Sequence, residues 1–361
     1  MCIVLGVCSG WAAAGPPRPR AAVGAIRWDA WHGGASSVGL AVEKSLGPQR
    51  WHYRLPFYAM ERSPTQVQVR ANTQAIMDQE IAYAHAAGLD YWAFVTYPPD
   101  SAMTLGLNLY LSSAQKSDIN FCLNLQGGWI GAGGARGWPA QVARYVRHFT
   151  EPTYQKVAGG RPLVYVFMPG EMVGGNRFGT WAAAKAAFDE LHRAATAAGL
   201  PAPYIVAQSW SPEGAKKHVD LLGLDAVSAY ATNGGGNRAP FADLSAHTER
   251  LWEGFRGTGA RVVPLVTSGW DRRPRVENPV PWEKPGGDID QYYESPTPQQ
   301  LAAHLKAALD WNQAHPEAAE ANAVLIYAWN ELDEGGWLVP TKLEGTARLD
   351  AVKELLRNGR E

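Results

Sequence analysis

The sequence predicts an α/β protein with one domain, a single (β/α)8 TIM barrel whose loops after strands 6 and 7 are long. Eight short runs rich in apolar, β-branched or aromatic residues recur along the 361 residues, and segments of helical periodicity separate them. Strands that are apolar throughout and alternate with helices indicate a parallel sheet with a covered outer side. Eight such units favour a closed barrel over a doubly wound open sheet, and no Gly-x-Gly-x-x-Gly follows the first strand.

The eight strands and their helices can be placed in order along the chain. We expect strands over residues 23–31, 90–97, 120–126, 163–168, 204–209, 225–230, 262–271 and 323–330. Helical periodicity covers residues 73–87, 107–116, 139–150, 180–198, 212–222, 245–257, 297–315 and 342–356. Gly88 and Gly223 each precede Leu-Asp and a strand, where a glycine can end the preceding helix in the left-handed conformation. The two long loops, 231–243 and 272–296, follow strands and are expected to shape a cleft.

The beginning of the chain predicts a leader segment over residues 1–22, followed by the barrel domain over 23–361. The apolar run from Met1 to Cys8 and the small residues around Ala14 resemble a signal peptide, although no basic residue precedes the run. We therefore expect a secreted or periplasmic protein. The alternatives are a start inside a longer leader or an irregular extension. A lipid anchor on Cys8 is a weaker alternative, because Leu-Gly-Val is a poor match to the residues that usually precede such a cysteine. Cleavage after Ala14 would leave Cys122 as the only cysteine, which excludes a disulfide framework.

Composition restricts the kind of partner. The formal net charge of -1, from 33 basic and 34 acidic residues, lacks the positive footprint of a nucleic-acid-binding protein. After the first residues, no apolar run approaches the length of a membrane span. The 15 tryptophans exceed what a core needs, which indicates indole faces presented to a ligand. The oligomeric state is left open by the sequence.

The carboxyl ends of the predicted strands are rich in indoles, amides and acids. Barrel enzymes carry their functional groups at these ends. Sugars offer apolar C–H faces and a rim of hydroxyl groups, which such side chains complement. Ordinary packing explains any single tryptophan equally well, but six lie near strand ends, and we expect at least two to be sugar platforms. The predicted substrate-binding residues are Trp28, Asp29, Trp31, Trp92, Tyr97, Gln126, Trp129, Gln208, Trp210, Tyr230, Trp270, Asp271, Asn330 and Trp337.

Two glutamates follow the last predicted strand and are the predicted catalytic residues. Glycoside hydrolysis requires two carboxyl groups, and Glu331 and Glu334 supply them at a spacing of three. On a helical turn this spacing puts the two Cβ atoms roughly 5–6 Å apart. Their proximity would raise one pKa, which suits a general acid. Taken alone, Glu-x-x-Glu also fits a solvated loop or a helix cap. Asp29 and Asp271 form an alternative pair.

Two segments resemble known families. Residues 329–335, Trp-Asn-Glu-Leu-Asp-Glu-Gly, resemble the Trp-Asn-Glu-Trp-x-Glu-Gly segment of family 99 glycoside hydrolases, and are equally similar to WbsX-like proteins of polysaccharide gene clusters, named as glycosyltransferases. Residues 269–275, Gly-Trp-Asp-Arg-Arg-Pro-Arg, resemble the Gly-Trp-Asp-x-x-Pro-Arg segment of the WbsX-like group. The chain departs from family 99 at Leu332, where Trp is usual, and at Asp333, where His is usual. The sugar and the linkage are therefore left open.

The resemblance implies a retaining glycoside hydrolase that acts on a poly- or oligosaccharide. In family 99 the first glutamate is a base that assists attack by the sugar's own 2-hydroxyl, which gives an anhydro-sugar intermediate. The second is the general acid and base. Carried over by resemblance, these roles fall on Glu331 and Glu334. The alternatives are a WbsX-like glycan-processing protein of polysaccharide assembly and a non-catalytic carbohydrate-binding protein. The presence of both glutamates favours the enzyme.

No cofactor or metal is predicted. Asp288-Ile289-Asp290 is an Asp-x-Asp of the kind that holds a metal-bound nucleotide sugar in some glycosyltransferases, but it lies in a long loop without a nucleotide-binding unit. His32 and His52 do not lie at ligand spacing on one element. The glycine run 234–236 is most simply a flexible loop, because no Lys-Ser/Thr follows it as in a phosphate-binding loop.

Overall fold

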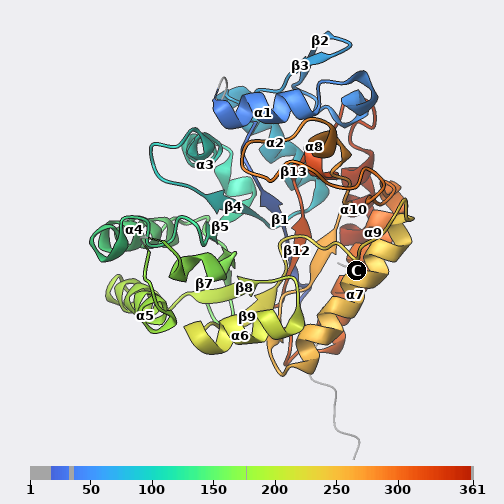
Figure 1. The fold of residues 1–361 in the computed structure, drawn as a ribbon. Coiled ribbons are helices and arrows are strands. Elements are labelled where there is room, and N and C mark those ends of the chain that lie inside the picture. Colours follow the sequence, from blue (N-terminus) through green and yellow to red (C-terminus); the bar gives the residue numbers. More distant parts are fainter. Residues whose placement is uncertain (1–17, 32–35, 176, 359–361) are drawn as a thin grey trace, which may run out of the picture.

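The computed structural model describes residues 18–31, 36–175 and 177–358 (Figure 1). Most of the predicted leader, including Cys8, and the histidine at position 32 lie outside the described residues. Within the described residues, no helix is long and apolar enough to cross a membrane.

A curled parallel sheet forms the centre of the molecule, and helices lie around its outer side (Figure 1). Its strands run in the order β10-β9-β8-β7-β5-β4-β1-β12-β11, and neighbours along this path pair in parallel. Their bounds are β1 (Ala22–Arg27), β4 (Tyr91–Thr96), β5 (Asn120–Gln126), β7 (Arg161–Phe167), β8 (Tyr204–Gln208), β9 (Ala226–Ser228), β10 (Arg261–Val262), β11 (Leu265–Thr267) and β12 (Ala323–Tyr327). The short β6 (Lys156–Val157) pairs with β7 in the antiparallel direction.

The two ends of the sheet path are consecutive in the chain. Only two residues separate β10 from β11, and the sequence placed both in one strand over 262–271. The Val263 N–H donates to the Val227 carbonyl at 2.9 Å, and the Leu325 N–H donates to the Pro264 carbonyl at 3.0 Å. Pro264 has no N–H to donate, so the ladder is interrupted there. The curled sheet is consistent with a TIM barrel (Figure 1). Residues 268–271 lie beyond the strand, contrary to the prediction.

Among the described residues, eight helices lie near the positions that periodicity predicted. They are α2 (Gln74–Ala87), α3 (Leu105–Ser112), α4 (Gly134–Phe149), α5 (Trp181–Ala197), α6 (Pro212–Leu222), α7 (Phe241–Gly257), α9 (Pro298–Ala314) and α10 (Ala347–Asn358). Gly88 and Gly223 end α2 and α6 with φ of 82° and 67°. The glycines that precede Leu-Asp are therefore the left-handed helix caps that the sequence predicted.

Several short elements were not predicted. Between β1 and α2 lie α1 (Ser37–Ser45), the 3-10 helix η1 (Gln49–Arg54) and a hairpin of β2 (Met60–Ser63) and β3 (Gln66–Gln68). The loop after β11 contains α8 (Arg273–Glu277), and the chain after β12 forms β13 (Asn330–Glu331), the 3-10 helix η5 (Leu332–Glu334) and β14 (Gly336–Trp337). Further 3-10 turns are η2 (Ala102–Thr104), η3 (Lys116–Asp118) and η4 (Pro169–Val173).

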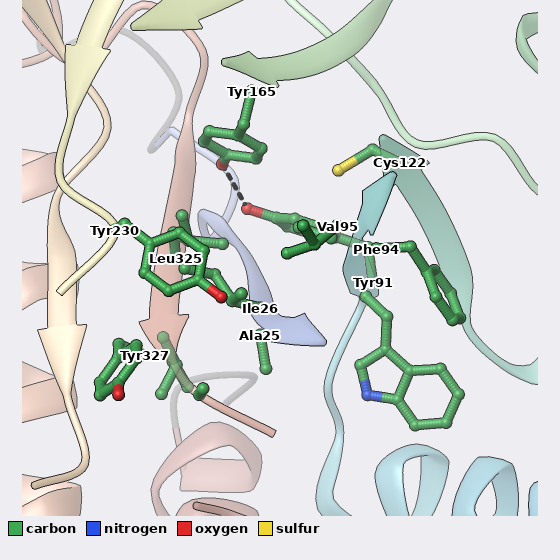
Figure 2. Close-up of a cluster of buried hydrophobic side chains, with 14 of the residues drawn as sticks. Ala25, Ile26, Tyr91, Phe94, Val95, Cys122, Tyr165, Tyr230, Leu325 and Tyr327 are labelled. Carbon is green, nitrogen blue, oxygen red and sulfur yellow. Dashed lines mark hydrogen bonds between the residues drawn. The ribbon is translucent and has the colours of Figure 1, made fainter. Parts of the chain in front are cut away.

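Buried tyrosines fill part of the inside of the sheet (Figure 2). The hydroxyls of Tyr91 and Tyr165 lie 2.8 Å apart, and the Tyr91 hydroxyl donates to the Val324 carbonyl at 3.0 Å. A Cβ atom on Gly24 would lie 2.2 Å from the Tyr91 ring, so β1 needs glycine here. The hydroxyls of Tyr91 and Tyr165 therefore have hydrogen-bond partners in the interior, as buried tyrosines usually do.

Candidate active site

The chain after β12 folds back on itself and presents both predicted catalytic glutamates. β13 pairs with β14 in the antiparallel direction, and η5 forms the turn between them. Gly335 ends this turn with φ of 89°, a conformation that glycine adopts without strain. Side chains three residues apart lie on one side of a 3-10 turn. Glu331 and Glu334 therefore project from one short turn at the carboxyl end of the sheet.

The two segments that resemble known families pack backbone against backbone. A Cβ atom on Gly269 would lie 2.2 Å from the Gly335 carbonyl oxygen, and one on Gly335 would lie 2.5 Å from the Asp271 nitrogen. The Asp271 N–H donates to the Glu334 carbonyl at 2.7 Å. Only glycine fits on both sides of this contact, so residues 269–275 and 329–335 form one unit.

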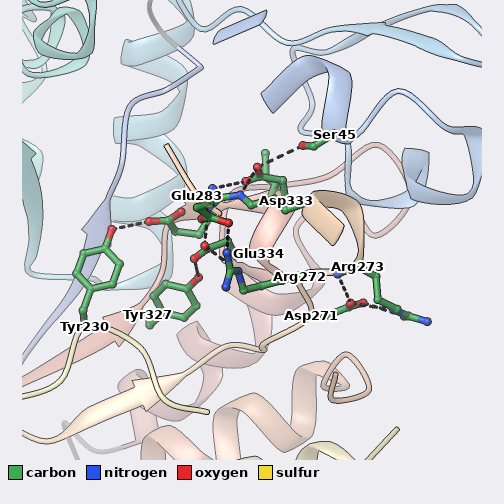
Figure 3. A network of polar contacts seen from close by, with 12 residues as sticks. Ser45, Tyr230, Asp271, Arg272, Arg273, Glu283, Tyr327, Asp333 and Glu334 are labelled. Atoms are coloured by element: carbon green, nitrogen blue, oxygen red, sulfur yellow. Dashed lines mark hydrogen bonds and ion pairs between the residues drawn. The ribbon is translucent and has the colours of Figure 1, made fainter. Parts of the chain in front are cut away.

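Arg275 of α8 joins this unit through its hydrogen bonds to Asp333 and Glu334, which are labelled in Figure 3. Its Nε and Nη2 donate to the two carboxylate oxygens of Asp333 at 2.7 and 3.1 Å, and its Nη1 donates to Glu283 at 2.7 Å. Nη1 also donates to Glu334. Both Arg275 and Asp333 are buried. A buried bidentate pair of this kind fixes the orientation of both partners.

Glu331 lies in surroundings that disfavour its charge. It is buried, and it accepts a hydrogen bond from the hydroxyl of Tyr230, which is labelled in Figure 3. Burial raises the pKa of Glu331 well above the usual range, and the neighbouring charge of Glu334 raises it further. The Arg275 charge opposes this shift but does not cancel it.

Glu334 has different neighbours. The Tyr327 hydroxyl donates to its Oε2 at 2.7 Å, and the Arg272 Nε lies 3.3 Å from its Oε1, where Arg275 also donates. Its side chain is 12% exposed, so it is more accessible than Glu331. Two carboxyl groups from one turn thus differ in their surroundings: Glu331 is more buried and accepts from Tyr230, whereas Glu334 is held by two arginines and Tyr327.

Aromatic side chains line both sides of this turn. On one side the Trp28 Nε1 donates to the Tyr97 hydroxyl at 2.7 Å, and Tyr97 contacts Trp129. On the other side Tyr230 packs on Phe167, which contacts Trp210, and Tyr327 packs on Trp270. Trp129 and Trp210 are 42% and 59% exposed, and Trp270 is half-buried. These three tryptophans remain candidates for stacking on a ligand.

Four predicted tryptophans are buried, among them Trp28, which is 9% exposed. Trp31 and Trp92 are fully buried and Trp337 is 1% exposed. Trp31 donates to the Asn330 carbonyl at 2.7 Å, Trp92 packs on Trp329, and Trp337 lies under the Arg348 guanidinium. A sugar platform needs an open indole face, so the prediction that Trp31, Trp92 and Trp337 bind substrate is not supported. They pack the fold instead.

The predicted acids Asp29 and Asp271 are engaged within the protein. Arg54 and Arg273 donate to Asp271. Burial alone would raise the pKa of Asp271, but the hydrogen bonds from Arg273 and the charge of Arg54 lower it below the usual range. Arg27 donates to Asp29 at 2.8 Å. Burial raises the pKa of Asp29. Arginine side chains thus hold both acids in place, and their roles in hydroxyl binding or as the alternative catalytic pair stay predictions.

Asn330 is also used internally. Its Oδ1 accepts the Trp28 backbone N–H at 2.9 Å, and its Nδ2 donates to Asp29 at 3.3 Å. Because these contacts tie the turn after β12 to the end of β1, we assign Asn330 a positioning role in place of the predicted contact with substrate.

Three amide side chains remain without complete hydrogen bonding. Among the described residues, neither the Oε1 of Gln126 nor that of Gln208 has a hydrogen-bond partner, and the same holds for both amide atoms of Asn124. Gln126 and Gln208 end β5 and β8, as predicted, and remain candidates for hydroxyl groups of a ligand. Asn124 was not among the predicted substrate-binding residues, and it lies two residues before Gln126, on the same face of β5.

The described residues contain no group of three or more His, Cys, Asp or Glu side chains that could hold a metal ion. Sequence reasoning also missed Trp282, which is 43% exposed and contacts Trp28 at 5.9 Å. It lies in the middle of the loop 272–296, whereas the predicted aromatic residues all lie near strand ends.

Comparison with known proteins shows similarity in fold but not in sequence. The sequence matches no family model and no curated protein. The structure is similar to two structures of the GH99 endo-alpha-mannosidase from Bacteroides thetaiotaomicron, one of them in complex with BIS-TRIS-propane. The TM-scores are 0.60 and 0.57 at 14% identity, and each match covers 94% of this chain and 97% of the other.

The chain has a GH99-like fold. At 14% identity the likeness concerns the fold alone, so it does not assign an activity or a site residue. It agrees with the family 99 part of the resemblance, whereas the relation to WbsX-like proteins stays a prediction.

Proposed function

We propose that this protein is a glycoside hydrolase that cleaves bonds within a poly- or oligosaccharide with retention, using Glu331 and Glu334. The observation that carries the proposal is the pair of carboxyl groups on one turn in unlike surroundings. We take the curled sheet to be a (β/α)8 barrel over residues 23–361, with β10 and β11 as two halves of its seventh strand. The pair then lies at the mouth where barrel active sites form.

The raised pKa falls on Glu331, the proposed base, and not on the proposed general acid as the sequence suggested; a raised pKa also suits a general base. A carboxylate with a higher pKa binds a proton more strongly, and proton transfer is most efficient when the pKa lies near the working pH. A sugar 2-hydroxyl that donates a hydrogen bond to Glu331 would favour its carboxylate form.

The proposed reaction has two steps. Glu331 takes the proton of the 2-hydroxyl as O2 attacks C1, and Glu334 gives its proton to the leaving oxygen as the glycosidic bond breaks. Water then attacks C1 of the anhydro sugar and gives a proton to Glu334, while Glu331 returns its proton to O2. Two displacements at C1 give net retention, and the carboxyl pair ends with the proton that it started with.

The substrate class is the first point to test. We propose a panel of α-mannan, α-glucan and galactan oligosaccharides, headed by α-mannosides because the similar structures are named endo-alpha-mannosidases. Product formation is followed by chromatography, and the anomer of the first product by NMR. We expect hydrolysis of at least one class with the anomer unchanged. Inversion, or no hydrolysis of any class, would contradict the proposal.

A WbsX-like role in polysaccharide assembly is the second candidate. It is favoured by one observation, the close packing of residues 269–275 against the catalytic turn. Transfer of a glycosyl group to a saccharide acceptor in place of water would support it. A non-catalytic binding protein would bind members of the panel and cleave none.

We also propose that the protein is secreted or periplasmic, on the basis of the apolar start of the sequence. Fractionation of expressing cells tests this, and recovery in the cytoplasmic fraction alone would contradict it.

A further inference from the structure

Trp282 brings an exposed indole to the candidate active site from a distant part of the chain. Its ring contacts the ring of Trp28, at the end of β1, edge to face with 5.9 Å between the centroids. The guanidinium of Arg275 lies 5.3 Å from the Trp28 ring and 5.8 Å from the Trp282 ring. Trp282 nevertheless keeps 43% of its surface exposed, so its contacts with Trp28 and Arg275 leave part of the indole open to a ligand.

Glu283, the residue next to Trp282, forms ion pairs with the same two arginines that contact Glu334. Glu283 accepts from the Arg275 Nη1 at 2.7 Å and also from Arg272 (Figure 3). Arg275 donates to Glu334, and the Arg272 Nε lies 3.3 Å from it. The indole and the catalytic carboxylate therefore share two anchors, so the position of Trp282 relative to Glu334 is fixed by ion pairs.

A pocket adjoins these anchors. It has a volume of about 280 Å³, and its lining includes Arg272, Glu283, Trp270, Asn233 and Gln291. This is near the lower end of the size of small-ligand sites. Its lining contains the indole of Trp270 with amide and charged groups, which suits a hydroxylated ring, and it adjoins Trp282 through Glu283 without including Trp282 itself.

We propose that Trp282 is a stacking platform for the apolar face of a pyranose ring, at the subsite next to Glu334, and that Glu283 positions it. The ligand is a sugar unit of the oligosaccharide chain adjacent to the unit that reacts. This inference rests on the proposed function, and it assigns a binding role to a loop residue that strand-end patterns do not identify. Glu283 is a positioning residue, since it acts through Trp282.

The test compares an oligosaccharide with a small substrate. On the panel member that the wild type hydrolyses, Trp282→Ala should raise KM roughly 5- to 100-fold and leave kcat within about twofold. An activated aryl monoglycoside of the same sugar does not reach the platform, so its kcat/KM should be unchanged. Trp282→Phe should recover part of the affinity, and Glu283→Gln should raise KM less than Trp282→Ala.

The control is Ile289→Ala, because Ile289 is a second exposed apolar residue of the same loop, at 40% exposure. This substitution should leave KM for the oligosaccharide and kcat/KM for the aryl monoglycoside unchanged. An unchanged KM in Trp282→Ala, or an equal rise in Ile289→Ala, would overturn the platform and leave the glycosidase proposal intact. If the wild type hydrolyses no panel member, the proposed function fails and this inference fails with it.

Discussion

Glu331 and Asp271 are buried acids at the same end of the sheet, yet their pKa values move in opposite directions. Burial and the charge of Glu334 raise the pKa of Glu331, whereas Arg273 and Arg54 outweigh burial at Asp271 and lower its pKa. A buried acid with a raised pKa is a candidate functional group, because structural ion pairs more often lower the pKa of an acid. A lowered one, with cations on both sides, marks a structural ion pair. The contrast separates the candidate catalyst from an acid that sequence reasoning could not distinguish from it.

The first prediction concerns the cost of Glu331 to stability. Because its pKa is raised on folding, the folded state binds more protons than the unfolded state, and the free energy of unfolding falls as pH rises from about 4.3 through the folded pKa. Glu331→Gln cannot titrate. Its stability relative to wild type should therefore increase with pH over this window, by about 1.4 kcal/mol for each unit of the shift.

Urea denaturation at pH 4 and pH 8 measures this difference. Glu354→Gln, on the exposed side of α10, is the control and should show no change of this kind. If the difference between Glu331→Gln and wild type is the same at both pH values, the assignment of an unfavourable environment to Glu331 is wrong.

At the scale of elements, α8 shows what local sequence cannot predict. It has only five residues, too short for helical periodicity, and Pro274 near its start is the only helix signal. Its position depends on the pair of Arg275 with Asp333, which lies 58 residues away in η5. By contrast, α6 has the predicted bounds, because Ser211 caps its start, Pro212 begins it and Gly223 ends it. Those three signals are local.

The second prediction concerns the Arg275–Asp333 pair. Arg275→Met should destabilise the protein by about 3–5 kcal/mol, because it leaves a buried aspartate without its partner. Adding Asp333→Leu removes the unpaired charge and should recover most of the loss. Activity should stay low in the double variant, because Glu334 has also lost a cation. Urea denaturation and kcat/KM on the hydrolysed substrate measure the two effects.

The outcome that contradicts this account is a double variant as unstable as Arg275→Met alone. Arg256→Met is the matched control, since Arg256 pairs with Glu253 on the surface of α7. It should change the free energy of unfolding by less than about 1 kcal/mol.

At the scale of the whole molecule, the sequence predicted the succession of strands and helices but not how the faces of each strand are used. Every residue of β4 is buried, so alternation did not reveal that Tyr91 faces the inside while Trp92 packs on Trp329. For the same reason the accessible indoles could not be separated from buried ones by position near a strand end. The exposure of Trp282 depends on the path of a long loop, and the sequence of this loop has no periodic pattern that predicts its path.

The site was predicted best where a short motif coincides with the end of a strand. Glu331 and Glu334 lie on one turn, as their spacing suggested, and Tyr230 meets Glu331 from the end of β9. The two arginine partners of Glu334 come from a loop about 60 residues earlier, and only the folded chain places them. The central claim is that these two glutamates divide the chemistry between them.

Single variants assayed on two leaving groups test this claim most directly. Glu334→Gln should lose activity on the natural oligosaccharide by roughly 10²–10⁴ and keep more on an activated aryl glycoside, which departs without a proton. Glu331→Gln should be nearly inactive on both, because no leaving group replaces the base that generates the attacking oxygen. Asp271→Asn serves as the comparison. Near-normal activity of Glu331→Gln, or a larger loss in Asp271→Asn than in either glutamate variant, would contradict the account.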